Sequence, residues 1–139
     1  MMLDLGRVDM IGRVVDYTFA KNDVIRRFRT GRISKADICD AHPELVRAAS
    51  SLGSDASQRC PVCRERKLKR VSYAFGPSLR RYNGRICTPD KMEFLISKHD
   101  EFVCYEVEVC IGCYWNHLVR SFVTGRAYTS RRSAAEEAR

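Results

Sequence analysis

The sequence predicts an α+β protein in which an N-terminal helical part packs on antiparallel strands that carry a helical insertion. Two observations carry this prediction. Apolar residues recur at spacings of three and four through residues 8–29, and they alternate with polar residues in 68–75 and 102–109. The chain has 139 residues, which is long enough to build a core. We divide it into a helical part at 1–58, a strand-rich part at 59–125 and a flexible tail at 126–139.

The helical part is predicted to contain about three helices. The first occupies residues 8–29, and Gly31 follows at the position where a helix commonly ends. Ser34 and Asp37 have the spacing of a capping box, which predicts a short second helix that ends near residue 39. The helical part therefore begins with two helices joined by a tight turn.

A third helix is predicted to begin at Pro43, because proline suits the first turn of a helix. The second and third helices could form a helix-turn-helix, but the third offers only Arg47, Ser50 and Ser51 to read bases. We therefore expect the helices to pack on the strands instead. The small polar residues 53–58 are predicted to be a linker.

The strand-rich part is predicted to contain three strands and one inserted helix. Strands are expected at 68–75, at 102–109 and at 114–123. Between the first two, a turn at Asn83-Gly84 precedes a helix near 89–98. In residues 102–109 valine and tyrosine occupy one face, while Cys104, Glu106 and Glu108 occupy the other.

Two CxxC pairs lie at the ends of predicted strands. Cys60 and Cys63 precede one strand, and Cys110 and Cys113 follow another. Two such turns brought together by antiparallel strands form a zinc ribbon, in which four thiolates hold one Zn²⁺. The pairs are 46 residues apart, whereas a compact ribbon has roughly 15–20 residues between them. The inserted helix accounts for the excess, and Gly112 is expected to supply a positive φ in the second turn.

Other uses of these cysteines are weaker. A redox CxxC usually begins a helix, and neither pair does so. Structural disulfides are rare in the cytoplasm, and the chain has seven cysteines, an odd number. His117 could replace one cysteine as a ligand, although four thiolates already complete the shell. Cys39 and Cys87 are expected to be small apolar fillers, and Cys104, which shares a strand face with Glu106 and Glu108, is not expected to be a ligand.

The positive charge of the chain is concentrated in one stretch. The net charge is +8, and residues 59–85 hold nine Lys or Arg and a single acidic residue. Some of these cations balance the charge of the thiolates, and Lys69 and Arg70 are expected to pair with Glu106 and Glu108. A basic turn that carries an aromatic residue suits contact with phosphates and bases. The predicted contact residues are Arg66, Lys67, Lys69, Arg70, Arg80, Arg81, Tyr82 and Arg85.

These features favour a cytoplasmic binding module that is not an enzyme. The sequence contains no catalytic constellation, no phosphate-binding glycine loop, no apolar run of membrane-spanning length and no N-terminal signal pattern. We expect it to dock on nucleic acid, or on a nucleoprotein or RNA polymerase-type complex of transcription or translation. The alternative is a protein–protein adaptor or a zinc- or redox-responsive regulator. Neither hypothesis includes a small-molecule substrate or a membrane.

The segments VVDY, ICDAHPELVRAA, CPVC and VEVCIGCYWNHLVRSFVTG resemble a family of small actinobacterial proteins of unassigned function. The resemblance covers about residues 10–125, and its last segment is the most specific. It implies a cytoplasmic actinobacterial protein with a paired-CxxC core at Cys60, Cys63, Cys110 and Cys113. It implies no activity, and Cys87 and Cys104 lie outside its pattern.

Overall fold

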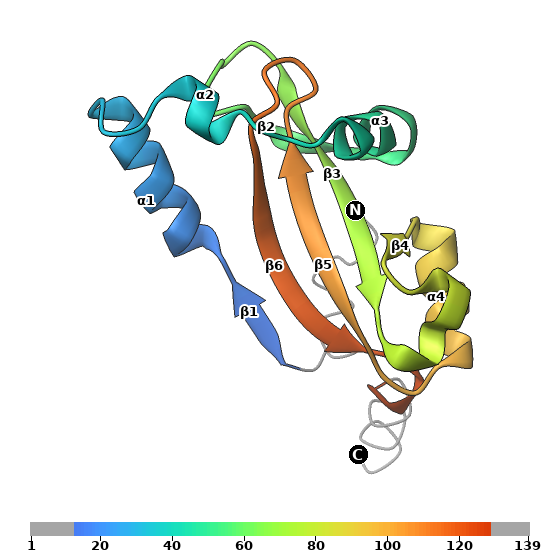
Figure 1. Ribbon diagram of the computed structural model, residues 1–139. Coiled ribbons are helices and arrows are strands. Elements are labelled where there is room, and N and C mark those ends of the chain that lie inside the picture. Colours follow the sequence, from blue (N-terminus) through green and yellow to red (C-terminus); the bar gives the residue numbers. More distant parts are fainter. Residues whose placement is uncertain (1–12, 129–139) are drawn as a thin grey trace. The chain divides into compact units, whose positions relative to one another are not determined.

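The computed structural model describes residues 13–128, which divide into two compact units (Figure 1). The unit that contains the CxxC pairs, here the cysteine unit, comprises residues 16–71 and 106–120. The other, here the insert unit, comprises the described residues 13–15, 72–105 and 121–128. Each unit thus combines segments that are far apart in the sequence. The predicted division after residue 58 stays a prediction.

Strands pair in the order β1-β6-β5-β3-β2, and β4 pairs with β3. Their bounds are β1 Val14–Asp16, β2 Ser54–Arg59, β3 Lys67–Phe75, β4 Arg85–Ile86, β5 Phe102–Val109 and β6 Asn116–Thr124. The helices are α1 Thr18–Arg29, α2 Lys35–Ile38, α3 Pro43–Leu52, the 3-10 helix η2 Pro77–Tyr82 and α4 Pro89–Lys98. The α+β class is therefore confirmed, whereas the zinc ribbon within it stays a prediction.

The helices of the cysteine unit begin and end for local reasons. The Ser34 hydroxyl accepts a hydrogen bond from the Asp37 backbone N–H, and the Asp37 carboxylate accepts one from the Ser34 backbone N–H, so the predicted capping box is present. Pro43 occupies the first turn of α3, as predicted. Gly31 adopts a φ of 78° after α1, in the left-handed region that favours glycine.

The core of the cysteine unit joins helices α1 and α2 to the four CxxC cysteines. Ile25 of α1, Ile38 of α2, Leu68 of β3 and Trp115 are buried together with Cys60 and Cys110. Cys63 and Cys113 pack against this cluster from its half-buried edge. The helical segments and the cysteine turns consequently share one hydrophobic core.

The insert unit has its own core, built on α4. Met92, Leu95 and Ile96 form the buried face of α4, as the sequence predicts, and they pack with Leu79, Phe102 and Phe122. Cys87 is buried in the same cluster, which agrees with its expected role as an apolar filler, and Cys104 is buried there too, although the sequence places it on the polar face of β5. The unit includes η2 and β4, which lie between β3 and α4 in the sequence.

Two segments of the helical part differ from the prediction. Residues 14–16 form strand β1, and α1 begins only at Thr18, whose backbone N–H donates to the Asp16 carboxylate at 2.7 Å. The predicted linker is strand β2, in which Ser54 pairs with Arg70 and Asp55 with Lys69. An edge strand needs no apolar face, so small polar residues do not exclude a strand there.

The predicted flexible tail lies largely outside the described residues, at 129–139. None of the described helices combines the length and the hydrophobicity that a bilayer span requires.

Candidate metal centre

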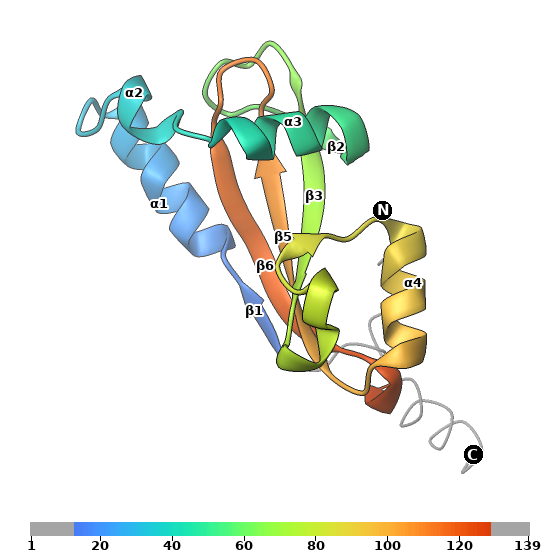
Figure 2. The ribbon, with the colours of Figure 1, turned by 45° about the vertical axis from the view of Figure 1, so that its right-hand side comes forward.

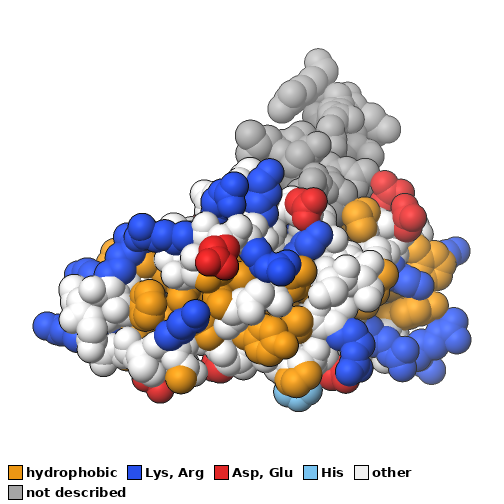
Figure 3. Space-filling model, turned by 90° about the horizontal axis from the view of Figure 1, so that it is seen from above, with side chains coloured by type: hydrophobic (Ala, Val, Ile, Leu, Met, Phe, Trp, Pro, Cys, Tyr) orange, Lys and Arg blue, Asp and Glu red, His pale blue; other side chains and the backbone are white. Residues whose placement is uncertain are grey.

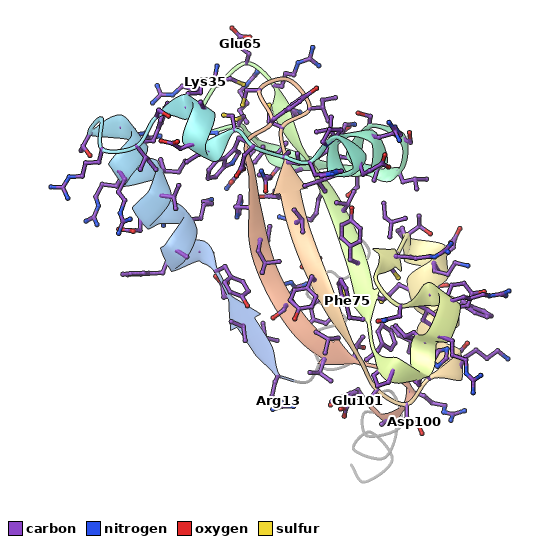
Figure 4. The ribbon with its side chains drawn as sticks, viewed as in Figure 1. Arg13, Lys35, Glu65, Phe75, Asp100 and Glu101 are labelled. Carbon is purple, nitrogen blue, oxygen red and sulfur yellow. The ribbon has the colours of Figure 1, made fainter. Side chains whose placement is uncertain are left out.

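The two CxxC pairs lie on loops that connect antiparallel strands. One loop joins β2 to β3 and the other joins β5 to β6, and the two loops lie side by side at the same end of these strands (Figure 2). Within them the sulfur atoms gather near α2 and the loop that carries Glu65 (Figure 4). The sequence thus places both pairs at the ends of strands, as predicted.

The two loops repeat one backbone pattern. The Cys60 carbonyl accepts from the Arg64 N–H at 3.0 Å, and the Cys110 carbonyl accepts from the Tyr114 N–H at 2.9 Å. Arg64 and Tyr114, each directly after the second cysteine, adopt φ values of 61° and 72°. The left-handed residue therefore follows each CxxC, and the expectation that Gly112 would supply the positive φ is wrong.

Gly112 instead lies close to the side chain of Arg66. A Cβ at this position would lie 2.6 Å from Cδ of Arg66, which packs over the second loop. This contact places Arg66 beside the cysteine turns, where a guanidinium can balance the charge of thiolates.

Backbone N–H groups point at the sulfurs in both turns. The Val62 N–H donates to Cys60 Sγ, and the Cys113 N–H donates to Cys110 Sγ, each at 3.4 Å. For Cys63, burial acts to raise the pKa, but hydrogen bonds from the Glu65 and Arg66 backbone outweigh it and lower the pKa to about 7. These donors favour a thiolate, which is the form that binds metal.

The four sulfurs have the spacing of a tetrahedral metal site. All four ligand atoms lie within 4.8 Å of one another. Cys60 Sγ lies 3.6 Å from Cys113 Sγ, and Cys63 Sγ lies 3.7 Å from Cys110 Sγ. Four sulfurs at about 2.3 Å from a central ion form a tetrahedron with edges of about 3.8 Å. Cys60, Cys63, Cys110 and Cys113 thus lie close enough together to hold one metal ion.

A fifth cysteine, absent from the predicted site, lies next to this cluster. Cys39 follows α2, and its Sγ lies 3.7 Å from Cys113 Sγ. It is half-buried, and burial together with the hydrogen bond to Cys113 raises the pKa of its thiol to about 12. The expectation that Cys39 is only an apolar filler overlooked this contact. No sequence spacing relates residue 39 to residue 113, so only the tertiary fold reveals the pair.

The face of β5 that carries Cys104, Glu106 and Glu108 is buried. Glu106 is fully buried and Glu108 is 4% exposed. Glu108 binds Arg70 of β3 at 2.7 Å, as predicted, and His117 of β6 at 3.0 Å. Glu106 pairs with Arg120. His117 is therefore held by a carboxylate and is not placed as a metal ligand.

The pKa of Glu108 follows from these two partners. Burial would raise it, but the hydrogen bonds and charges of His117 and Arg70 lower it to about 2. The carboxylate is consequently ionised at neutral and mildly acidic pH.

The predicted binding residues fall in both units. In the cysteine unit Lys69 pairs with Asp55 at 2.6 Å and Arg70 with Glu108, so both cations are engaged. In the insert unit the Arg81 guanidinium lies 5.0 Å from the centre of the Tyr82 ring, over which Lys91 also lies. Arg66, Lys67, Arg80 and Arg85 are exposed and form no ion pair within residues 13–128. On the face in Figure 3, basic side chains are interspersed with hydrophobic ones.

Comparison with known proteins agrees with the resemblance found in the sequence. Uncharacterised proteins of Mycobacterium bovis (Mb0050) and Mycobacterium tuberculosis (Rv0049) are each 38% identical over 117 residues. These alignments cover 84% of this chain and 85% of each relative. No solved structure matches the chain. The model of a family of unknown function, DUF5318, matches residues 9–138, and the chain belongs to that family.

Proposed function

We propose that the protein is a non-enzymatic zinc-binding module whose Zn²⁺ is held by Cys60, Cys63, Cys110 and Cys113. The tetrahedral spacing of the four sulfurs supports this proposal most directly. Thiolates also hold iron, but four thiolates on one structural ion are most typical of zinc. A zinc ion with four protein ligands has no open position for water, so we assign it a structural role.

The zinc would stabilise the core that joins α1, α2 and the two cysteine loops. These elements meet through residues that include the ligands themselves, among them the fully buried Cys110. Four thiols packed this closely repel one another once ionised, and a divalent cation removes that repulsion. Purified protein should therefore contain one zinc per chain by elemental analysis. A folded protein with clearly less metal would refute the metal assignment, and one iron per chain would refute zinc.

We further propose that the module docks on nucleic acid, alone or within a transcription or translation complex. The exposed cations Arg66 and Lys67 next to the cysteine loops support this, as do Arg80, Arg81 and Arg85 around Tyr82. Lys69 and Arg70 contribute less than the sequence suggests, because each has a carboxylate partner. Phosphate contacts release counterions. Each contact therefore makes the slope of log K against log salt concentration steeper by about one.

This docking is tested by fluorescence anisotropy with single-stranded RNA and duplex DNA at several salt concentrations. Arg66→Ala/Lys67→Ala and Arg80→Ala/Arg81→Ala should each weaken binding and lower the salt slope by about one to two. Arg47→Ala is the matched control, since Arg47 is exposed and already pairs with Glu44 at 2.6 Å. Absence of binding at low salt would refute nucleic-acid docking while leaving the zinc site intact.

A protein–protein adaptor is the second candidate. The ring of Phe19 on α1 is 88% exposed, which is unusual for a phenylalanine and suits contact with a protein. Affinity purification from the native cell with and without nuclease separates the two candidates. Partners that persist after nuclease treatment and depend on Phe19 would favour the adaptor.

A further inference from the structure

Cys113 has two sulfur neighbours, and one of them lies outside the four-cysteine cluster. Its Sγ is 3.6 Å from that of Cys60, a member of the cluster, and 3.7 Å from that of Cys39. Both distances match the edge of a thiolate tetrahedron around zinc, about 3.8 Å. Cys39 therefore lies next to the position of Cys113 at a ligand-like separation.

Cys39 and Cys113 lie on the less buried side of the cluster, and Cys113 is the ligand there that has a fifth sulfur beside it. Cys60 is 1% exposed and Cys110 is fully buried, whereas Cys39, Cys63 and Cys113 are half-buried. Moving a sulfur at this edge disturbs less of the core than moving Cys60 or Cys110 would. The edge with Cys39 and Cys113 is thus the part of the site where a ligand can change.

The backbone holds Cys39 in this place. Its own N–H donates to the Lys35 carbonyl at 2.8 Å, which closes α2. Two residues later the Ala41 N–H donates to the Tyr114 carbonyl at 3.0 Å, which ties the segment after α2 to the second cysteine loop. Cys39 consequently approaches Cys113 from a segment anchored on both sides.

We propose that Cys39 is an exchangeable ligand of the metal centre, able to take the position of Cys113. This rests on the proposed function, because it requires that the four cysteines bind zinc. In the exchange the bond from the metal to Cys113 Sγ breaks and a bond to Cys39 Sγ forms. The proton of Cys39 moves to Cys113 along the existing hydrogen bond, in which Cys39 is the donor. The number of bound thiolates and the total charge do not change.

Exchange would leave Cys113 as a free thiol at the half-buried edge while the ion stays four-coordinate. The three remaining ligands, Cys60, Cys63 and Cys110, hold the ion throughout. The site would then tolerate the loss of Cys113, but not the loss of a ligand that has no neighbouring reserve thiol.

Single and double serine variants test this asymmetry in the full chain. Each is loaded with Co²⁺, whose sulfur charge-transfer absorption reports the number of bound thiolates, and zinc affinity is measured by chelator competition. Cys113→Ser should keep a four-thiolate spectrum and bind zinc within about 10-fold of the unaltered protein. Cys60→Ser and Cys39→Ser/Cys113→Ser should both lose about 100-fold or more, because no fourth thiolate remains. Cys87→Ser, in the insert unit, is the control for loss of a thiol elsewhere.

The proposal is overturned if Cys113→Ser behaves like Cys60→Ser and adding Cys39→Ser changes nothing more. If the unaltered protein takes up neither zinc nor cobalt, the proposed zinc function fails as well.

A second measurement avoids variants that do not fold. Iodoacetamide treatment of the zinc-loaded protein should give single adducts divided between Cys39 and Cys113, with zinc retained. Adducts on Cys39 alone would show a fixed site and overturn the exchange.

Discussion

Replacing Glu108 by glutamine removes one negative charge from the interior of the cysteine unit and keeps the shape of the side chain. Glu108 is 4% exposed, and its carboxylate binds Arg70 at 2.7 Å and His117 at 3.0 Å. Glutamine can still accept a hydrogen bond, so the variant tests the charge itself. The two partners, which lie on β3 and β6, would lose the anion between them.

The size of the effect follows from the pKa of Glu108. Its partners lower the pKa from the ordinary 4.5 to about 2, and each pKa unit corresponds to about 1.4 kcal/mol. The ionised carboxylate therefore contributes about 3 kcal/mol to the free energy of unfolding at pH 7. Because the pKa is lower in the folded state, this contribution is present above about pH 4.5 and is lost as the pH falls toward about 2.

Urea denaturation of zinc-saturated protein measures this contribution. We expect Glu108→Gln to lower the free energy of unfolding by about 3 kcal/mol from pH 7 down to about pH 5, with a smaller difference in more acidic buffer. Taking the difference between the two proteins cancels any acid-induced loss of metal that they share. Glu44→Gln, at an exposed ion pair, should cost less than about 0.5 kcal/mol. A loss below about 1 kcal/mol at pH 7, or one that grows on acidification, would refute the reasoning.

Three further changes test other parts of the fold. Gly125→Ala should cost about 3 kcal/mol or more in urea denaturation, because its φ is 140° and a Cβ would lie 2.2 Å from the Asp100 carbonyl oxygen. Gly31→Ala is the control, because φ is also positive at Gly31 but a Cβ there would meet no atom within 4 Å. It should cost only about 1 kcal/mol, and an equal loss of stability in both variants would contradict the clash with Asp100. Ser34→Ala removes the side-chain half of a capping box and should cost about 1 kcal/mol, whereas no loss would indicate that α2 is held by packing alone. Chelation of the metal should abolish hydrogen-exchange protection in α1 and the cysteine loops. Protection should remain in α4, because its core contains none of the four ligands. Equal loss of protection in the cysteine loops and in α4 would argue against separate cores.

Local chemistry explains which elements the sequence predicts well. The capping box at Ser34, the proline at Pro43 and the apolar face of α4 act within a few residues, so the sequence states them directly. The CxxC pairs are equally local, and they lie at the ends of strands, as predicted. Cys87 is a core residue, as predicted, whereas the sequence did not predict the burial of Cys104.

The errors arise where the fold decides the role of a residue. Alternation separates the two faces of β5 but does not say which is buried, and the polar face is buried because Arg70, His117 and Arg120 pair with its two glutamates. The polar residues of β2 form a strand because β3 offers them hydrogen-bond partners. Cys39 comes to lie beside the four-cysteine cluster only through the tertiary contacts of α2 and the segment that follows it.

The basic stretch at 59–85 has more positive residues than a binding partner could contact, because several of them already have partners within the protein. Lys69 and Arg70 are engaged by carboxylates, and the Arg59 guanidinium donates to the Glu65 carbonyl. A zinc ion with four thiolates carries a formal charge of −2, which Arg66 beside Gly112 is well placed to offset. In the unbound protein, cations of this stretch thus stabilise a buried glutamate and the proposed metal centre. Loss of zinc should therefore change the charge of this surface as well as its shape, which links metal binding to any docking that depends on Arg66 or Lys67.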